Sequence, residues 1–543
     1  MSSARAEENK SSPAVAEAKV LPPPVKEEKP EEKKKKKKEE EKEVVEYVLE
    51  PLPSGVDFVD VYWIEEPFVK IVIAPIPGRG GQKGYFIDEI TLTKQEKNAF
   101  EKLRDILSRE LRPPEDMSVD ARKHVFEEAR RLMKKYKGVL GSLSQESIQR
   151  IEYYIRRDLI GYGPINPIIE DKNIEDISCD GVNKPIYVWH KRYESLPSNL
   201  RIMDKSYFND FIIKLAHFAG KHISAAFPIV DAMLPGKHRL AATYGDEVST
   251  FGSTFTIRKF REEPFSIIDL INLGSLNPAL AAYFWFILDN RLTIIIIGGT
   301  GAGKTSFLNA LTNLFKPGLK IVTVEETAEL NIPHDNWVQF VTRESYGLGT
   351  SKIGEITMFD LVKTSLRYRP DYLIVGEIRG AEAFVMFQAM ATGHGGLSTV
   401  HAENIEYAIK RMTSPPMNIA ESYIPLMNVA VLVERVVLPK KAGVPFGRRV
   451  RQVWELDPEG NRINIASWNP VEDTFEIDFS KSVHLPNICR KSGMPPDWYI
   501  RELQVRESVI RWMMANNITH FRDVARVVTE FHVKRAEVLS KLR

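Results

Sequence analysis

The stretch RLTIIIIGGTGAGKTSFLNAL constrains the fold of this 543-residue chain more than any other feature. Its apolar run 294–297 predicts a buried strand, and the letters SFLNAL begin a predicted helix. Between them lies Gly298-x-x-x-x-Gly303-Lys304-Thr305, whose glycines let backbone N–H groups curl around phosphates. The N-terminus of the helix adds partial positive charge there. The stretch therefore predicts a P-loop in a parallel α/β sheet.

A P-loop in this context predicts ATP and Mg²⁺ as ligands. Lys304 is expected to reach the β- and γ-phosphates, and Thr305 is expected to ligate Mg²⁺. The predicted nucleotide-binding residues are Gly298, Gly299, Thr300, Gly301, Ala302, Gly303, Lys304, Thr305 and Ser306.

Two carboxylates follow the next predicted strand, residues 320–325. The strand ends in Glu325, and Glu326 comes directly after it. A carboxylate at the C-terminal end of a strand in a phosphate-binding sheet can orient the attacking water. We therefore expect Glu325 and Glu326 at the catalytic centre.

The stretch YLIVGE predicts another strand, residues 372–375, followed by Gly376 and Glu377. Gly376 occupies the position where a metal-binding Asp is expected. Parallel strands present their C-terminal ends to the ligand, so Glu377 is expected to face the nucleotide and to contact Mg²⁺ directly or through water.

Two histidines, His394 and His401, flank the next predicted strand in the stretch MATGHGGLSTVHAEN. A single histidine is usually a satisfied surface or core residue. Two that bracket a strand of a nucleotide-binding sheet are expected to sense the γ-phosphate. A metal site is not predicted here, because no further His or Cys clusters nearby.

These four elements together, in their order and spacing, resemble the secretion ATPase superfamily of type II secretion, type IV pilus and archaellum motors. VEETAE (324–329) looks like the acidic box of that family, YLIVGEIR like its variant metal strand, and TGHGGLSTVHA (392–402) like its histidine box. The resemblance covers residues 150–440 well and extends weakly from residue 44 to the end. PHDNWVQFVTRES looks most like the archaeal branch.

The resemblance implies a homohexamer in which ATP lies between an N-domain and a RecA-like domain, with N-domain arginines completing the sites. From the matched N-domain motif, Arg239 and Arg258 are candidates. From the core domain, Arg343, Arg367 and Arg369 are candidates. An always-charged guanidinium suits this role because it stabilises charge on the transferring phosphoryl group.

The chain departs from the family pattern at two places. Relatives commonly have Glu-Asp where this chain has Glu325-Glu326, so which carboxylate polarises the water stays open, although Glu326 aligns with the Asp. The four-Cys module of many bacterial relatives is missing. Only Cys179 and Cys489 occur, so neither zinc nor a disulfide framework is expected.

Charge and hydropathy restrict the partners. The chain has 75 basic and 73 acidic residues, a formal net charge of +2, which gives no global argument for nucleic acid. No apolar run reaches the ~18 residues that a membrane span needs. We expect a cytoplasmic protein that reaches the inner face of the cell membrane through a partner.

The predicted fold class is α/β, with a RecA-like P-loop core on a parallel sheet, α+β domains before it and a small mixed region after it. Changes in composition and periodicity predict five segments. They are a disordered charged tail (1–43), a small α+β domain (44–116), a helical and α+β N-domain (117–262), the ATPase domain (263–440), and C-terminal strands with a helical tail (441–543).

The leading hypothesis for function is a hexameric motor that hydrolyses ATP to assemble a pilus-like or secretion filament through a polytopic membrane platform protein. Archaellum assembly or rotation is the alternative within this class. A RecA-like nucleic-acid motor is an alternative of another class, against which the near-neutral charge and the histidine box argue. A scaffold that binds nucleotide without hydrolysis is disfavoured by Lys304, Thr305, Glu326 and Glu377.

Overall fold

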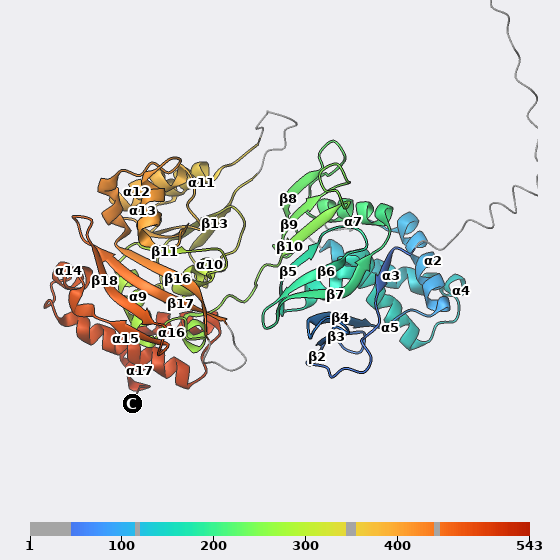
Figure 1. The fold of residues 1–543 in the computed structure, drawn as a ribbon, viewed down its shortest axis with the longest axis horizontal. Helices are drawn as coiled ribbons and strands as arrows, with labels where there is room; N and C mark the ends of the chain where they lie inside the picture. The colour runs from blue at the N-terminus through green and yellow to red at the C-terminus, as the bar shows by residue number, and fades with distance from the viewer. Residues whose placement is uncertain (1–44, 114–119, 344–353, 439–445, 543) are drawn as a thin grey trace, which may run out of the picture.

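The computed structural model describes residues 45–113, 120–343, 354–438 and 446–542. Two lobes lie side by side, an N-lobe (residues 45–258) and a core lobe (267–542), and the segment 259–266 joins them (Figure 1). No helix within these ranges is long and apolar enough to cross a membrane. The tail 1–43, predicted to be disordered, lies outside the described residues.

The N-lobe is built on one sheet, which in the described residues has ten strands in the order β2-β3-β4-β7-β6-β5-β10-β9-β8, with β1 paired to β7. The strands are β1 (Tyr47–Leu49), β2 (Asp60–Glu65), β3 (Val69–Pro75), β4 (Lys83–Glu89), β5 (Ile174–Cys179), β6 (Pro185–His190), β7 (Glu194–Ile202), β8 (Ile229–Met233), β9 (Arg239–Thr243) and β10 (Thr254–Arg258). The helices are α2 (Lys94–Glu110), α3 (Ala121–Lys135), α4 (Lys137–Leu140), α5 (Gln145–Tyr154), α6 (Asn166–Glu170) and α7 (Lys205–Phe218).

The boundary predicted at residue 116 does not separate two domains. Strand β4 pairs in parallel with β7 at Tyr85 and Ser198, so the sheet continues across the predicted boundary. One hydrophobic core contains Ile71 and Ile87 from the first segment together with Phe208 and Ile257 from the second. Apolar side chains from both segments bury each other, so the two segments form one lobe.

The core lobe is built on a second sheet, of nine strands in the described residues, in the order β13-β12-β14-β15-β11-β16-β17-β18-β19. The strands are β11 (Ile294–Gly298), β12 (Ile321–Glu325), β13 (Trp337–Val341), β14 (Tyr372–Val375), β15 (Gly395–His401), β16 (Val429–Val437), β17 (Phe446–Leu456), β18 (Arg462–Asn469) and β19 (Thr474–Ile477). Strands β11 to β16 pair in parallel with their neighbours, and β16 to β19 pair antiparallel. The predicted α/β fold class is confirmed.

Helices cover both faces of this sheet. They are α8 (Ile267–Asn272), α9 (Pro278–Asp289), α10 (Lys304–Leu311), α11 (Met358–Ser365), α12 (Glu382–Ala391), α13 (Ile405–Thr413), α14 (His484–Lys491), α15 (Trp498–Ala515), α16 (Phe521–Val533) and α17 (Arg535–Ser540). Ile294 and Ile296 of β11 face the core formed with α9, α10 and the C-terminal helices, whereas Ile295 and Ile297 face the core formed with α11 to α13. A strand buried on both faces is apolar throughout, which explains the run 294–297.

The boundary predicted at residue 440 does not end the ATPase domain either. Strand β17 continues the sheet by pairing with β16. The C-terminal helices pack under the sheet, at the bottom of the core lobe in Figure 1, and Val509 and Phe531 share one core with Leu280. Residues 267–542 thus form a single lobe in the part of the chain that the structure describes.

A buried charge network ties α15 to α9. Arg506 donates to Asp289 at 2.7 Å and to Glu502 at 2.5 Å, and all three side chains are at most 8% exposed. The guanidinium lies 5.5 Å from the ring centroid of Trp285 and 5.1 Å from that of Phe286. Buried carboxylates depend on such partners because water cannot reach them.

Replacing Arg506 by methionine should destabilise the core lobe. Asp289 and Glu502 would lose their central cation, and we expect a loss of about 3 kcal/mol in unfolding free energy. Scanning calorimetry should record a lower Tm of the core-lobe transition, by roughly 5–10 °C. The matched control is Arg511→Met, because the pair between Arg511 and Glu507 is exposed and worth less than about 1 kcal/mol. Equal Tm values for the two variants would contradict the prediction.

Candidate functional site

The P-loop lies where the sequence predicts it, between β11 and α10. Gly301 and Gly303 have φ values of +70° and +90°, the left-handed region that favours glycine. Gly298 must also lack a side chain, because a Cβ there would lie 2.5 Å from the carbonyl oxygen of Val433 on β16. The loop is therefore shaped by the two motif glycines, Gly298 and Gly303, and by Gly301 between them.

Lys304, the first residue of α10, folds back onto the loop. Its Nζ donates to the carbonyl oxygen of Gly299 at 3.0 Å. Burial lowers the pKa of Lys304, and the nearby Glu377 carboxylate opposes this shift. The ammonium is thus held at the P-loop beside an acidic group.

The register of the sheet gathers the other predicted elements at the same edge. His401, the last residue of β15, pairs with Gly298, the last residue of β11. Val324 on β12 pairs with Val375 on β14, so Glu325 follows beside Gly376. The C-terminal ends of β11, β12, β14 and β15 therefore lie together, as parallel pairing requires.

Glu325 is a buried anchor. Its carboxylate accepts hydrogen bonds from the backbone N–H groups of Glu329 at 2.8 Å and Leu330 at 2.9 Å. It accepts a third from the side-chain amide of Gln339 at 2.9 Å. Burial raises the pKa of Glu325, and these three hydrogen bonds oppose the shift. At 3% exposure it fixes the segment 326–330, which we call the acidic loop.

Arg379 bridges two further carboxylates, Glu326 and Glu377. The Arg379 guanidinium lies 2.8 Å from Glu377 and 3.4 Å from Glu326. The Glu326 side chain is 50% exposed, in contrast to that of Glu325. Of the two neighbouring carboxylates in the acidic box, the structure therefore leaves Glu326 exposed and uses Glu325 to hold the loop.

Glu377 fits a metal-binding role. Its Oε1 atom is buried and has no hydrogen-bond partner within the described residues. An unpaired buried carboxylate oxygen is costly unless a cation or proton donor reaches it. Carboxylate and hydroxyl oxygens are ligands that Mg²⁺ accepts, so Glu377 and Thr305 are suitable residues. No group of three His, Cys, Asp or Glu residues suited to a metal occurs in the described ranges.

The structure separates the two histidines and corrects the prediction for His394. His401 lies at the phosphate edge beside Gly298. His394 precedes β15 and lies at the opposite edge, about 20 Å away along a seven-residue strand. Its Nδ1 lies 3.0 Å from the carbonyl oxygen of Ala389. Of these two histidines, His401 is the one near the phosphate site of its own chain.

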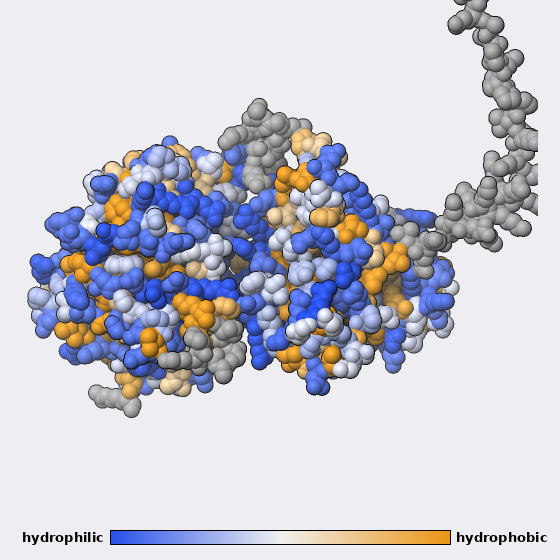
Figure 2. Space-filling model, viewed as in Figure 1, coloured by the Kyte–Doolittle hydropathy of each residue, from blue (hydrophilic) through white to orange (hydrophobic). Residues whose placement is uncertain are grey.

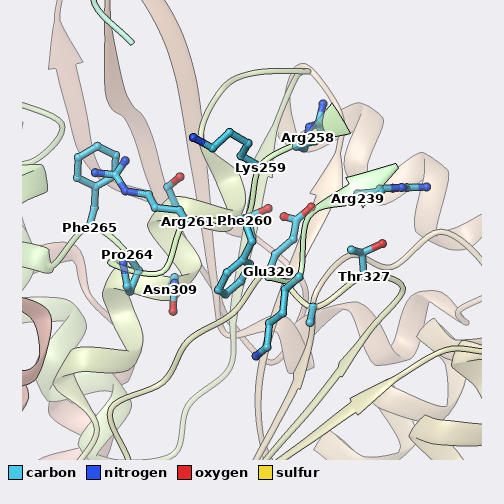
Figure 3. Close-up of a pocket in the computed structure, with 14 residues that line it drawn as sticks. Arg239, Arg258, Lys259, Phe260, Arg261, Pro264, Phe265, Asn309, Thr327 and Glu329 are labelled. Carbon is cyan, nitrogen blue, oxygen red and sulfur yellow. The ribbon is translucent and has the colours of Figure 1, made fainter. Parts of the chain in front are cut away.

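A pocket opens between the lobes, beside α10 (Figure 3). Hydrophilic residues also gather along the visible seam between the lobes (Figure 2). Two predicted arginines, Arg239 and Arg258, line the pocket. Arg239 donates to Asp231 at 2.7 Å and 3.1 Å, and Arg258 donates to Asp176 at 3.2 Å, so acidic residues of the N-lobe orient both. The remaining lining residues are Lys237, Lys259, Phe260, Arg261, Pro264, Phe265, Thr305, Ser306, Asn309, Thr327, Ala328 and Glu329.

Sequence reasoning missed several cations of this site. Lys237, Lys259 and Arg261 line the pocket, and the run RKFR at 258–261 was the available signal for two of them. Arg448 on β17 donates to the carbonyl oxygen of Gly301 at 3.1 Å. It comes from the antiparallel part of the sheet, where no nucleotide motif draws attention to it.

The core-lobe arginines lie away from the phosphate edge or point elsewhere. Arg367 and Arg369 are exposed and precede β14, so they are at the edge opposite Glu377. Arg343 follows β13 and donates to the carbonyl oxygen of Gly354 at 2.7 Å. Neither Arg367 nor Arg369 lies at the site of its own chain.

Comparison with known proteins agrees with this arrangement. The family model "Type II/IV secretion system protein" matches residues 159–466, more than half of the chain. The chain belongs to this family. An uncharacterized protein of Methanocaldococcus jannaschii is 36% identical over 407 residues, which cover 73% of this chain and 72% of that protein.

Other relatives of this secretion-family protein carry more specific names. A putative conjugal transfer protein of Mycobacterium tuberculosis is 36% identical over 258 residues, 46% of this chain and 71% of that protein. Among solved structures, the ATPase DotB of Legionella pneumophila is 15% identical with a TM-score of 0.38, over 66% of this chain and 92% of that one. A TM-score this low adds nothing to the fold described above.

Family membership and the intact P-loop together make this chain an ATP-hydrolysing, nucleotide-binding enzyme. The predicted enzyme class is therefore confirmed. The role of each site residue remains a prediction.

The secretion-family ATPase should bind ATP more weakly as the pH rises through 8. Burial lowers the pKa of Lys259 to about 8, so its charge is present at pH 7 and lost by pH 9. Because the pocket loses one cation, we expect the affinity for ATP to fall about threefold between pH 7 and pH 9. Titration of a fluorescent ATP analogue measures it. Lys259→Arg should abolish this dependence, since arginine stays charged; an unchanged dependence in that variant would contradict the assignment.

Proposed function

We propose that this secretion-family ATPase binds ATP with Mg²⁺ in the pocket between its lobes and hydrolyses it to move the lobes relative to each other. The observation that carries the proposal is the composition of this pocket. Thr305 and Ser306 contribute the P-loop helix, Glu329 the acidic loop, and Arg239 and Arg258 the N-lobe. A ligand in this pocket contacts both lobes at once, so a change in its charge changes what holds them together.

The P-loop and its surroundings support a division of labour. The loop and the α10 N-terminus bind the phosphates, and Lys304 exchanges its contact with Gly299 for a phosphate oxygen. Glu326 orients the attacking water, while the buried Glu325 holds the loop that carries it. Thr305 and Glu377 would hold Mg²⁺, which when bound neutralises phosphate charge. His401 is close enough to the P-loop to respond to the γ-phosphate.

Arginines of the N-lobe complete this chemistry. Arg239 and Arg258 line the pocket, and carboxylates of their own lobe hold both side chains. A guanidinium placed this way stabilises charge that develops on the transferring phosphoryl group. They reach the phosphates when the N-lobe closes on the core.

We further propose that six copies form a ring. Arg367, Arg369 and His394 lie at the edge opposite the P-loop, so they can act only on a neighbouring copy or on a partner. The ring would act at the cytoplasmic face of the membrane on a polytopic platform protein, and thereby assemble a pilus-like or secretion filament. The relatives named as conjugal transfer proteins support a role in transport through a cell envelope.

The two neighbouring glutamates should respond differently to the same substitution. Glu326→Gln should retain ATP binding and the wild-type Tm but lose hydrolysis by at least about 100-fold, because it removes the group that orients the water. Glu325→Gln should lose hydrolysis and also lower the Tm, because the buried carboxylate that accepts hydrogen bonds from two backbone N–H groups loses its charge. Phosphate-release assays, nucleotide titration and calorimetry measure these effects. Hydrolysis by Glu326→Gln at the wild-type rate would refute the assignment.

Deletion of the gene should remove one class of surface filament. We expect pili or secretion filaments to disappear from electron micrographs while swimming persists, and a plasmid copy to restore them. A copy carrying Lys304→Ala should fail to restore them, because the P-loop lysine is needed for hydrolysis. Loss of swimming with intact pili would instead favour the archaellum.

A further inference from the structure

The side chain of Gln339 lies between the N-lobe and the acidic loop. Gln339 is in the middle of β13, the edge strand of the core-lobe sheet. Its Nε2 donates to the Glu325 carboxylate at 2.9 Å and is 3.3 Å from the carbonyl oxygen of Leu330. Its Oε1 accepts a hydrogen bond from the Nζ of Lys237 in the N-lobe, at 3.4 Å. One amide thus contacts both lobes.

The chemistry of its two neighbours fixes the direction of this amide. An ionised carboxylate only accepts hydrogen bonds, and an ammonium only donates them. Nε2 must therefore face Glu325, and Oε1 must face Lys237. Reversing the amide would break both contacts together, so the two contacts support each other.

On the core side, the contact reaches the catalytic region through Glu325. The carboxylate that accepts a hydrogen bond from Gln339 also accepts hydrogen bonds from the backbone N–H groups of Glu329 and Leu330. These residues end the acidic loop, which begins at Glu326 and forms part of the pocket wall. Movement of the Gln339 amide would therefore disturb the anchor of the loop that carries Glu326.

On the N-lobe side, Lys237 lies in the turn between β8 and β9, two residues before Arg239. Its φ of +62° is in the left-handed region, and its Nζ lies 5.2 Å from the ring centroid of Phe260. Lys237 moves with the lobe that carries the pocket arginines. Its contact with Gln339 therefore exists only at certain positions of the N-lobe.

We propose that Gln339 is a positioning residue that couples the position of the N-lobe to the acidic loop. With Lys237 in contact, the amide is held against Glu325, and Glu326 keeps the orientation that hydrolysis needs. When the N-lobe turns away, the amide loses its outer partner and the loop loses support. The inference rests on ATP hydrolysis at this site and not on the filament that the motor drives.

A double-mutant cycle tests the coupling. Lys237→Met removes the cation and keeps the stem, and Gln339→Met removes the amide and keeps the length. We expect kcat to fall about fivefold in Lys237→Met and about tenfold in Gln339→Met, and the double variant to match Gln339→Met within about twofold. Interacting residues give such non-additive effects, whereas independent ones multiply. Phosphate release at saturating ATP measures kcat, so changes in ATP affinity do not enter the cycle.

Two further variants separate positioning from general stability. Lys237→Arg keeps a long cation that can still donate to Gln339, so its kcat should be higher than that of Lys237→Met. Gln339→Glu can still accept from Lys237 but faces Glu325 with a second carboxylate, so its kcat should be lower than that of Gln339→Met. Gln388→Met on α12 is the matched control, because Gln388 is exposed and belongs to neither lobe contact. Its kcat and Tm should equal those of wild type.

The proposal would be overturned if the fold-losses in kcat of the two single variants multiplied in the double variant. A folded Gln339→Met with wild-type kcat would also overturn it. If Gln339→Met does not fold, the cycle is run with Gln339→Ala, which also removes the amide, and multiplying effects there would overturn the proposal in the same way. Hydrolysis by wild type and by Gln388→Met shows that the ATPase is present, so such results refute the coupling alone. Lack of hydrolysis in both would instead refute the assignment of ATP hydrolysis to this site.

Discussion

The parallel pairing of β12, β14, β15 and β11 is the constraint on which the rest of the core lobe depends. Each of these strands ends in a residue or is followed by residues to which we assign a role in the proposed chemistry, and parallel register brings those ends to one edge. Parallel strands need crossovers and burial on both faces, which α8 to α13 and the C-terminal helices provide. The antiparallel strands β17 to β19 extend the sheet and add Arg448 to the P-loop side. The packing that stabilises the lobe thus also assembles the site.

The N-lobe and the segment that joins it to the core lobe place a concentration of positive charge at the pocket. The whole chain is almost neutral, yet Lys237, Arg239, Arg258, Lys259 and Arg261 lie within a short stretch of strands and linker that faces the pocket. Local arrangement and not net charge therefore decides what the pocket binds. Burial lowers the pKa of both Lys259 and Arg261, whereas carboxylates of the N-lobe hold Arg239 and Arg258. An anionic ligand would offset this concentrated positive charge, which would favour closure of the lobes around the ligand.

The sequence allowed prediction of those parts of the site that a single continuous segment forms. The P-loop and the ends of β12 and β14 are local patterns of strand, glycine and carboxylate, so their placement needed only the rule for parallel sheets. Features that depend on pairing between distant segments were not accessible. Nothing local shows that β4 joins β7, that β17 continues the ATPase sheet, or that Gln339 meets both Glu325 and Lys237. His394 is an intermediate case, because the length of β15 already implied that only one of two flanking histidines reaches the phosphate edge.

The glycine that replaces the expected metal-binding Asp has a physical reason in this sheet. Gly376 follows β14 beside Glu325 of β12, and a Cβ on it would lie 3.4 Å from the Glu325 Cγ. Neighbouring residues of paired strands point to the same face, so an aspartate at 376 would direct its carboxylate at the buried Glu325. Two carboxylates in contact away from water repel, and one would have to bind a proton. Because Glu325 anchors the acidic loop, glycine suits position 376, and the next carboxylate, Glu377, which we propose as the metal ligand, comes one residue later. The glycine at 376 is therefore explained by the buried carboxylate of Glu325 beside it.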